Sequence, residues 1–414
     1  GALSLSPFSQ LELREVKITP KGAEPLAQID LVRLRYSLWS LLRGNIQAYE
    51  ITVEKPVITL LEQVDGSRNL PKLPPSGPKS TAPLILDLHQ IQLRNGSLHY
   101  TIRGPKGPVS TITIGNLNVA LDQVVTAQPG KLTVQGEAGM EQLPADKIAG
   151  KLGGEFTLTL GRDALPTLIK GSLGVDLGPG AGAFRDASGL RVALESDVLP
   201  TEVRDLRLAF RRAGQELARL RLSGPYDAAK PEARLDFELS GVDRQVLVLI
   251  GGATGFDLGE TSVAAKGKLN LLKNGEMAAS NGELTVHKMS LGTAAGRTPV
   301  TEFTTQYKVE ANLKDNAALL EEFKISAADG KGEWLSGSLD RPMNLAWGSA
   351  PPGFRESRFT LKLARFQLAE WQALLGSNAP AGMLRADLMV SSERDGRLLK
   401  YDLKAMASQL SAAV

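Results

Sequence analysis

One stretch decides the fold: Glu232-Ala233-Arg234-Leu235-Asp236-Phe237-Glu238-Leu239, in which charged and apolar residues alternate strictly. Successive side chains of a β-strand point to opposite faces, so this pattern predicts a strand with one charged and one apolar face. The same alternation recurs at 155–160, 219–223 and 358–363. Apolar spacings of three and four residues, which are typical of amphipathic helices, are nearly absent. The chain is therefore predicted to be mostly β, without βαβ units.

Turn signals near these runs favour hairpins and hence an antiparallel sheet. They are the Asx-Gly dipeptides, which suit the positive φ angles of two-residue turns: Asp65-Gly66, Asn95-Gly96, Asn274-Gly275, Asn281-Gly282, Asp329-Gly330 and Asp395-Gly396. A turn at Asn95-Gly96 would place Leu93 opposite Leu98 and Ile91 opposite Tyr100.

Phase slips in the alternation, one near His89-Gln90 and one between Ile114 and Leu117, predict β-bulges, which bend a sheet. The expected fold is an elongated, strongly curved antiparallel sheet, a β-groove, with a few short helices.

The helical segments are few. Residues 37–44 and 368–376 each read as a short helix that ends at glycine. The Pro-rich residues 71–83 predict a loop, and the glycine-rich residues 171–189 predict a weakly ordered stretch.

A weak repeat is also present, because the apolar segments ending at Gly251 and Gly376 are each followed by hairpin pattern, about 125 residues apart (376 − 251). Such a repeat suggests an array that can be extended. The expected organisation is amino-terminal strands and a short helix, a Pro-rich loop, a groove, a groove repeat and the start of a further, truncated unit, with bounds 1–70, 71–83, 84–240, 241–365 and 366–414.

Composition excludes several classes of function. The 414 residues carry 48 Lys and Arg against 45 Asp and Glu, and a net charge of +3 argues against a nucleic-acid partner. The absence of cysteine removes thiol catalysis, thiolate metal sites and disulfides. His89, His99 and His287 have no second ligand at metal-binding spacing. The glycine-rich residues 251–255 lack the Lys-Ser/Thr pair of a phosphate loop. No enzyme, metal or cofactor is predicted.

An apolar sheet face must be buried against something. A second sheet would do this, as in a sandwich, and so would acyl chains lying in a trough. Composition leaves both open, whereas the meander and the recurrent bulges favour the trough. The residues predicted to line it, taken from one strand phase, are Leu93, Leu98, Tyr100, Leu206, Leu208, Phe210, Leu235, Phe237, Val286, Tyr307, Val309, Phe359 and Leu361.

The order of segments in the first 125 residues carries a family resemblance. Residues 8–18, 29–44, 55–60 and 65–70 precede the Pro-rich loop, and Ile91-Gln92-Leu93-Arg94-Asn95-Gly96-Ser97-Leu98-His99-Tyr100 follows it. This order resembles the amino-terminal block of the AsmA-like family, relatives of TamB. Residues 366–387 resemble the carboxy-terminal helix-then-hairpin unit of that family, whereas residues 130–230 match only as generic strands.

The resemblance implies a β-groove protein of the Gram-negative envelope that conducts phospholipid between the inner and outer membranes without catalysis. It implies a periplasmic location, inner-membrane anchoring by an amino-terminal helix that this chain lacks, and phospholipid acyl chains as partners. It names no envelope protein partner.

Two other functions are alternatives to lipid transport. A scaffold or chaperone for outer-membrane protein assembly would add client strands to the edges of the sheet. A glycan-binding protein would need aromatic platforms, and an aromatic content of 5% disfavours it.

Overall fold

The computed structural model describes residues 2–6, 10–20, 25–37, 39, 47–64, 67–70, 87–105, 107–125, 127–142, 145–161, 166–227, 230–251, 257–293, 296–315, 317–346, 356–376, 380–393 and 398–411. These residues are mostly strand, with a few short helices, so the predicted fold class is confirmed. The chain divides into two compact units. Unit 1 is Gly1–Pro200 with Asp205–Glu216, and unit 2 is Thr201–Arg204 with Leu217–Val414.

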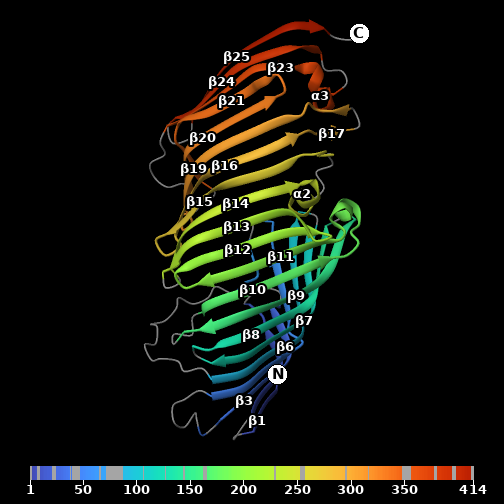
Figure 1. The fold of residues 1–414 in the computed structure, drawn as a ribbon, viewed down its shortest axis with the longest axis vertical. Coiled ribbons are helices and arrows are strands. Elements are labelled where there is room, and N and C mark those ends of the chain that lie inside the picture. Colours follow the sequence, from blue (N-terminus) through green and yellow to red (C-terminus); the bar gives the residue numbers. More distant parts are fainter. Residues whose placement is uncertain are drawn as a thin grey trace. The chain divides into compact units, whose positions relative to one another are not determined.

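Unit 1 is built from long strands that pair mainly with their neighbours in the chain (Figure 1). They are β1 (Ala2–Ser6), β2 (Gln10–Ile18), β3 (Ala27–Tyr36), β4 (Gln47–Glu54), β5 (Val57–Glu62), β6 (Asp87–Gly104), β7 (Gly107–Val125), β8 (Pro129–Gln142), β9 (Asp146–Leu160), β10 (Pro166–Leu177), β11 (Leu190–Leu199) and most of β12 (Glu202–Arg212).

The sheet of unit 1 is mixed, not purely antiparallel as the turn signals predicted. β6 runs parallel to both β4 and β5, with Ile51 beside Ile91 and Leu60 beside Tyr100. A parallel return needs a connection of a dozen residues or more. The chain between Glu62 and Asp87 is long enough to provide it.

The hairpin predicted at Asn95-Gly96 is wrong, because β6 runs straight through this dipeptide. Asn95 has φ +53°, and the register shifts between Leu93 and Gly96, so the dipeptide forms a β-bulge. The register shift expected near His89-Gln90 lies at Asn95-Gly96 instead. A positive φ angle occurs in β-bulges as well as in tight turns, so the Asn-Gly dipeptide alone does not distinguish the two. The bulge predicted between Ile114 and Leu117 is confirmed by a register shift.

The other Asx-Gly dipeptides divide in the same way. Asn274-Gly275 and Asp329-Gly330 lie in hairpin connections, as predicted, whereas Asn281-Gly282 lies inside a strand. Asp65-Gly66 and Asp395-Gly396 fall outside the described residues.

The glycine-rich stretch 171–189 is ordered, contrary to prediction. Its first part completes β10, and Gly182–Ala187 forms the 3-10 helix η1, in which Phe184 and Ala187 are fully buried. A Cβ at Gly171 would lie 2.1 Å from the carbonyl oxygen of Glu155. Glycine at this position therefore permits close strand approach rather than disorder.

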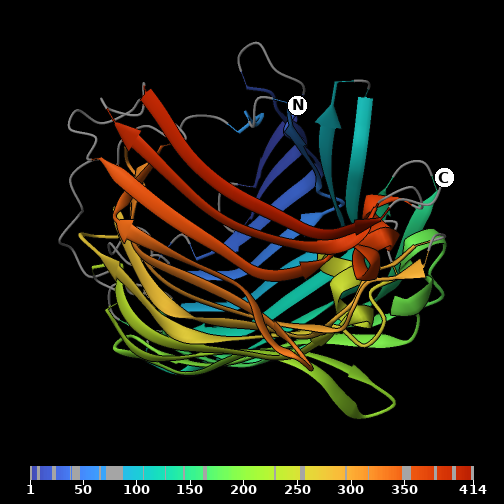
Figure 2. The same cartoon turned by 90° about the horizontal axis from the view of Figure 1, so that it is seen from above.

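Unit 2 is an antiparallel meander whose strands bend along their length (Figure 2). Its strands are most of β13 (Gln215–Asp227), β14 (Glu232–Asp243), β15 (Ser262–Leu272), β16 (Met277–Met289), β17 (Gly292–Thr293), β18 (Gly296–Arg297), β19 (Thr301–Asn312), β20 (Ala317–Asp329), β21 (Gly332–Arg341), β22 (Met343–Ala346), β23 (Ser357–Gln367), β24 (Ala381–Glu393) and β25 (Leu398–Ser411).

The helix-then-hairpin repeat is present in unit 2. Helix α2 (Arg244–Gly251) precedes β15 and β16, and η2 (Leu368–Trp371) with α3 (Gln372–Leu375) precedes β24 and β25. The helix predicted at 37–44 and the loop predicted at 71–83 fall largely or wholly outside the described residues. Within the described part of the chain, no helix is both long and apolar enough to cross a membrane.

Candidate functional site

The strand register of unit 2 assembles one continuous apolar face. Phe237 of β14 pairs with Gly267, Gly267 with Gly282, and Gly282 with Tyr307. Tyr307 in turn pairs with Phe323 of β20. Paired residues project to the same side of a sheet. We call this side the apolar face of unit 2.

Seven of the residues predicted from the sequence share the apolar face of unit 2. The registers place them there from four non-adjacent stretches of sequence: Leu235, Phe237, Val286, Tyr307, Val309, Phe359 and Leu361. Sequence reasoning missed Phe323 and Ile325, although Glu322-Phe323-Lys324-Ile325 shows the same alternation that identified the others.

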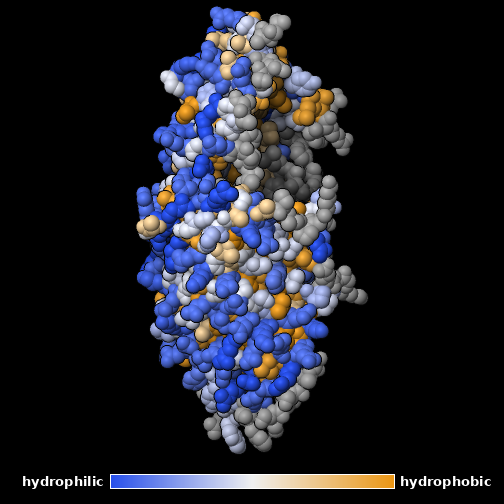
Figure 3. Space-filling model, turned by 90° about the vertical axis from the view of Figure 1, so that its right-hand side faces the viewer, coloured by the Kyte–Doolittle hydropathy of each residue, from blue (hydrophilic) through white to orange (hydrophobic). Residues whose placement is uncertain are grey.

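The opposite face of unit 2 is charged and polar. Its residues pair in alternating sign, with Glu238 opposite Lys266 and Lys266 opposite Glu283, and Lys266 Nζ lies 3.9 Å from Glu283 Oε1. In the upper half of Figure 3, where the strands of unit 2 lie, hydrophilic side chains dominate the left-hand side of the view. The sheet thus has one water-compatible side and one apolar side.

Glycines on the apolar face leave space that neighbouring large side chains fill. A Cβ on Gly267 would lie 2.8 Å from Cε1 of Phe237, so the phenyl ring leans over this glycine. The ring of Tyr307 leans over β16 in a similar way, since its hydroxyl lies 3.2 Å from Ser280 Oγ. At Gly337 the side chains of Leu361 and Ile325 close over the backbone. Large side chains therefore lie parallel to the surface of the sheet instead of projecting perpendicular to it.

The apolar face of unit 2 has no second layer among the described elements of that unit. Most of its large side chains are only half-buried, and Leu235 is the exception at 9% exposure. A sandwich core would bury such residues almost completely. The register and burial therefore favour a single-layer, open apolar surface.

Short helices pack along the side of this face where strands β14 and β23 end. Val242, near the end of β14, and Val246, in the first turn of α2, are buried. Further along, Trp334 packs 5.3 Å from Trp371 and 5.7 Å from Phe366, measured between ring centroids. The hydroxyl of Thr293 donates to the carbonyl oxygen of Ala373 at 3.0 Å, which ties β17 to α3. The edge is thus firmly packed, unlike the face beside it.

The remaining predicted residues lie in unit 1. Leu93 pairs with Val119 and Leu98 with Ile114, and the register of β8 places both pairs on one face despite the bulge. Tyr100 lies on the same strand. On β12, Leu206, Leu208 and Phe210 alternate with Asp205 and Arg207, whose side chains form an ion pair of 2.9 Å. Phe210 is buried, which leaves its ring little surface for a ligand.

Tyr100 belongs to a polar cluster. Its hydroxyl donates to Glu62 Oε2 at 2.6 Å, and Arg68 Nε donates to the same oxygen at 2.9 Å. These two bonds hold the pKa of Glu62 below its ordinary value, the bond from Tyr100 having the larger effect. The bond to the carboxylate raises the pKa of Tyr100. The ring can still contact apolar groups, but its hydroxyl is committed.

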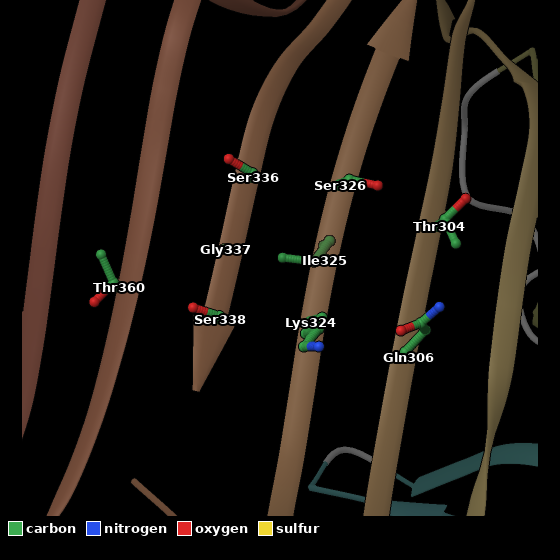
Figure 4. A pocket seen from close by; sticks show the side chains of 9 residues that line it. All are labelled: Thr304, Gln306, Lys324, Ile325, Ser326, Ser336, Gly337, Ser338 and Thr360. Carbon is green, nitrogen blue, oxygen red and sulfur yellow. The ribbon is translucent and has the colours of Figure 1, made fainter. Parts of the chain in front are cut away.

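A shallow depression of about 320 Å³ lies on the polar face of unit 2 (Figure 4). Its rim carries small hydroxyl residues such as Ser326, Ser336 and Ser338, with Lys324 and Gln306 beside them. A second depression of about 820 Å³ lies between two rows of paired charges on the same face. Both are gaps between rows of outward-pointing side chains.

Two of the three histidines, His287 and His89, make local side-chain contacts. His287 Nδ1 lies 2.8 Å from Glu302 Oε2, and the ring of His89 stacks on Tyr49 with centroids 5.8 Å apart. Among the described residues, no group of three histidine or carboxylate side chains is placed to hold a metal ion.

Comparisons of the sequence with protein-family models and with curated proteins give no match. The functional argument for this chain therefore rests on the geometry of its sheet.

Proposed function

We propose that the apolar face of unit 2 binds the acyl chains of phospholipids. One observation carries the proposal: a continuous apolar row across the strands is left half-exposed, while the other side of the same sheet is charged. Each acyl methylene group removed from water contributes ~0.8 kcal/mol. A surface of this kind lowers the cost of moving a lipid out of a bilayer.

The same geometry supports transfer without catalysis. Equivalent apolar positions recur on successive strands, so an acyl chain can move along the face without returning to water at each step. The charged face keeps the protein compatible with an aqueous compartment.

Within this proposal the chain is a member of the AsmA-like family. It acts in the periplasm between the inner and outer membranes, anchored to the inner membrane through a helix outside this chain. The helix-then-hairpin repeat at α2–β16 and η2–β25 supports this assignment, together with the order of segments in the first 125 residues.

Photo-crosslinking tests which face meets lipid. A photoreactive residue at position 237 or 307, in place of Phe237 or Tyr307, is expected to capture phospholipid when the protein is purified from a Gram-negative host. The same group at Glu238 or Lys308 is expected to capture none, because the adjacent residue points to the opposite face. Mass spectrometry of the adducts measures the outcome, and equal capture on both faces would exclude the groove.

Histidine is expected to play no part in binding. Replacing His89, His99 and His287 together with glutamine should leave the amount of co-purified phospholipid unchanged, because none of them lies in a ligand cluster. Native mass spectrometry measures the bound lipid. A loss of lipid in this variant, or on treatment with a chelator, would contradict the proposed mechanism.

The rival function, a scaffold that adds client strands to a sheet edge, makes a different demand. It needs a free edge and tolerates a charge on the apolar face. The lipid groove needs the face to stay apolar.

A further inference from the structure

Two hydroxyl groups lie next to each other on the apolar face of unit 2. Ser280 of β16 pairs with Leu269 on one side and with Val309 on the other, so the register places Ser280 on this face. The hydroxyl of Tyr307 lies 3.2 Å from Ser280 Oγ. Gly282, which pairs with Tyr307, has no side chain, and this leaves room for the ring to lean along β16 towards Ser280. We call Ser280 and Tyr307 the hydroxyl pair.

The side chains around the hydroxyl pair are apolar. Leu269 and Val309 flank Ser280 in register, and Phe323 of β20 pairs with Tyr307. Both members of the pair are only half-buried, so a ligand lying on the face can contact them. The pair therefore forms a small polar spot that is bordered by hydrocarbon.

The hydroxyl pair carries one hydrogen more than its own hydrogen bond uses. Each hydroxyl has one hydrogen and can both donate and accept. One hydrogen lies in the contact between the two oxygens, whichever of them donates it. Within the described part of the chain, neither hydroxyl makes a second hydrogen bond. The other hydrogen can therefore bond to an acceptor on a ligand.

A ligand that covers the hydroxyl pair must supply that acceptor. Water bonds to the second hydrogen while the face is open, but acyl chains lying on the face exclude water. A buried donor without a partner is costly, whereas a carbonyl oxygen satisfies it. A plain hydrocarbon offers no acceptor, and an ionised carboxylate would meet no cation among Leu269, Val309 and Phe323. An ester carbonyl fits, because it accepts a hydrogen bond and is uncharged.

We propose that the hydroxyl pair of Ser280 and Tyr307 binds the ester carbonyl of an acyl chain that lies on the apolar face of unit 2. This binding mode rests on the proposed function and adds to it the chemical group that is recognised. The hydrogen bond holds the ester end of the chain at β16 and β19, and the hydrocarbon part lies on the apolar side chains beside them. Ester-linked lipids are therefore bound more tightly than ether-linked ones.

Competition between an ester lipid and an ether lipid tests this preference. The full chain is incubated with vesicles that contain equal amounts of phosphatidylcholine with two ester-linked oleoyl chains and of its ether-linked analogue. The analogue has the same headgroup and chain length but lacks the carbonyl groups. Native mass spectrometry measures the ratio of the two bound lipids. The unmodified chain is expected to favour the ester lipid by about threefold or more, the effect of one hydrogen bond between neutral groups.

Two variants assign the preference to particular side chains. Tyr307→Phe combined with Ser280→Ala removes both hydroxyls and keeps the ring, so lipid should still bind but the ratio should fall to about one. Thr305→Val is the matched control. Thr305 pairs with Leu284 and Ile325, so this change removes a hydroxyl from the same face but outside the pair, and the preference should remain. Circular dichroism checks that both variants keep their strands.

The possible outcomes distinguish this binding mode from the proposed function. If the unmodified chain binds neither lipid, the proposed function fails and the binding mode fails with it. If it binds both lipids equally, acyl-chain binding stands but recognition of the ester is excluded. Recognition by the hydroxyl pair is also excluded if the double variant keeps the preference, or if Thr305→Val loses as much of it as the double variant does.

Discussion

Leu361→Asp is expected to abolish phospholipid binding and to leave the protein folded. Leu361 lies on the apolar face of unit 2, between Gly337 and Leu388 in register. An unpaired carboxylate among acyl chains costs several kcal/mol to desolvate, and each 1.4 kcal/mol corresponds to about a tenfold loss of affinity. Leu361 is only half-buried, so water still reaches a carboxylate there when no lipid is bound. The cost to folding is expected to stay near the typical ~1 kcal/mol.

Asn281→Asp is the matched control, because it adds the same group to the opposite face. Asn281 lies between Lys268 and Lys308 in register, which favour a negative charge. Native mass spectrometry of co-purified phospholipid and thermal melting by circular dichroism measure both variants. If Leu361→Asp unfolds the protein, the apolar face is a packed core. If both variants lose lipid equally, the assignment of faces is wrong.

Gly267→Ala is expected to lower the free energy of unfolding more than Leu361→Asp does. The new Cβ would lie 2.2 Å from the carbonyl oxygen of Asn281 and 2.7 Å from Cα of Gly282. Backbone atoms cannot rotate away as a flexible side chain can, so β15 and β16 must separate. Overpacking of this kind typically costs about 1–3 kcal/mol. Urea unfolding followed by circular dichroism measures the change.

Gly153→Ala controls for the general effect of replacing a strand glycine. Gly153 also lies inside a strand, β9, but a Cβ there would meet no heavy atom within 4 Å. A compatible glycine-to-alanine change is neutral or stabilising by up to about 1 kcal/mol. Equal unfolding midpoints for the two variants would show that the close approach at Gly267 has no energetic consequence.

Much of the local structure could be predicted from alternation alone. Residues 232–239 form part of β14, with the charged side chains on one face and the apolar ones on the other. The helix at 368–375 followed by a hairpin was also predictable, because an apolar segment ending at Gly376 precedes renewed alternation. These features depend on residues close together in the chain.

Sequence signals that are compatible with two different local structures led to wrong predictions. Asn95-Gly96 supplies the positive φ of a turn, but the same conformation forms the bulge inside β6. The glycines of 171–189 suggested weak order, yet Gly171 is required where β10 approaches β9 closely. Local sequence leaves such choices open, because the deciding neighbour is a distant strand.

In the strictly alternating stretches, such as 232–239, the sequence by itself determined that strands form and which side chains share a face, since both follow from the two-residue period of a β-strand. Only the tertiary structure decided which strands are neighbours and in what register. It set β6 parallel to β4 and β5, and it aligned Phe237, Gly267, Gly282 and Tyr307 in one row. The physical reason is that ladder hydrogen bonds form between backbone groups that are alike in every residue. Register therefore depends on how distant side chains pack together.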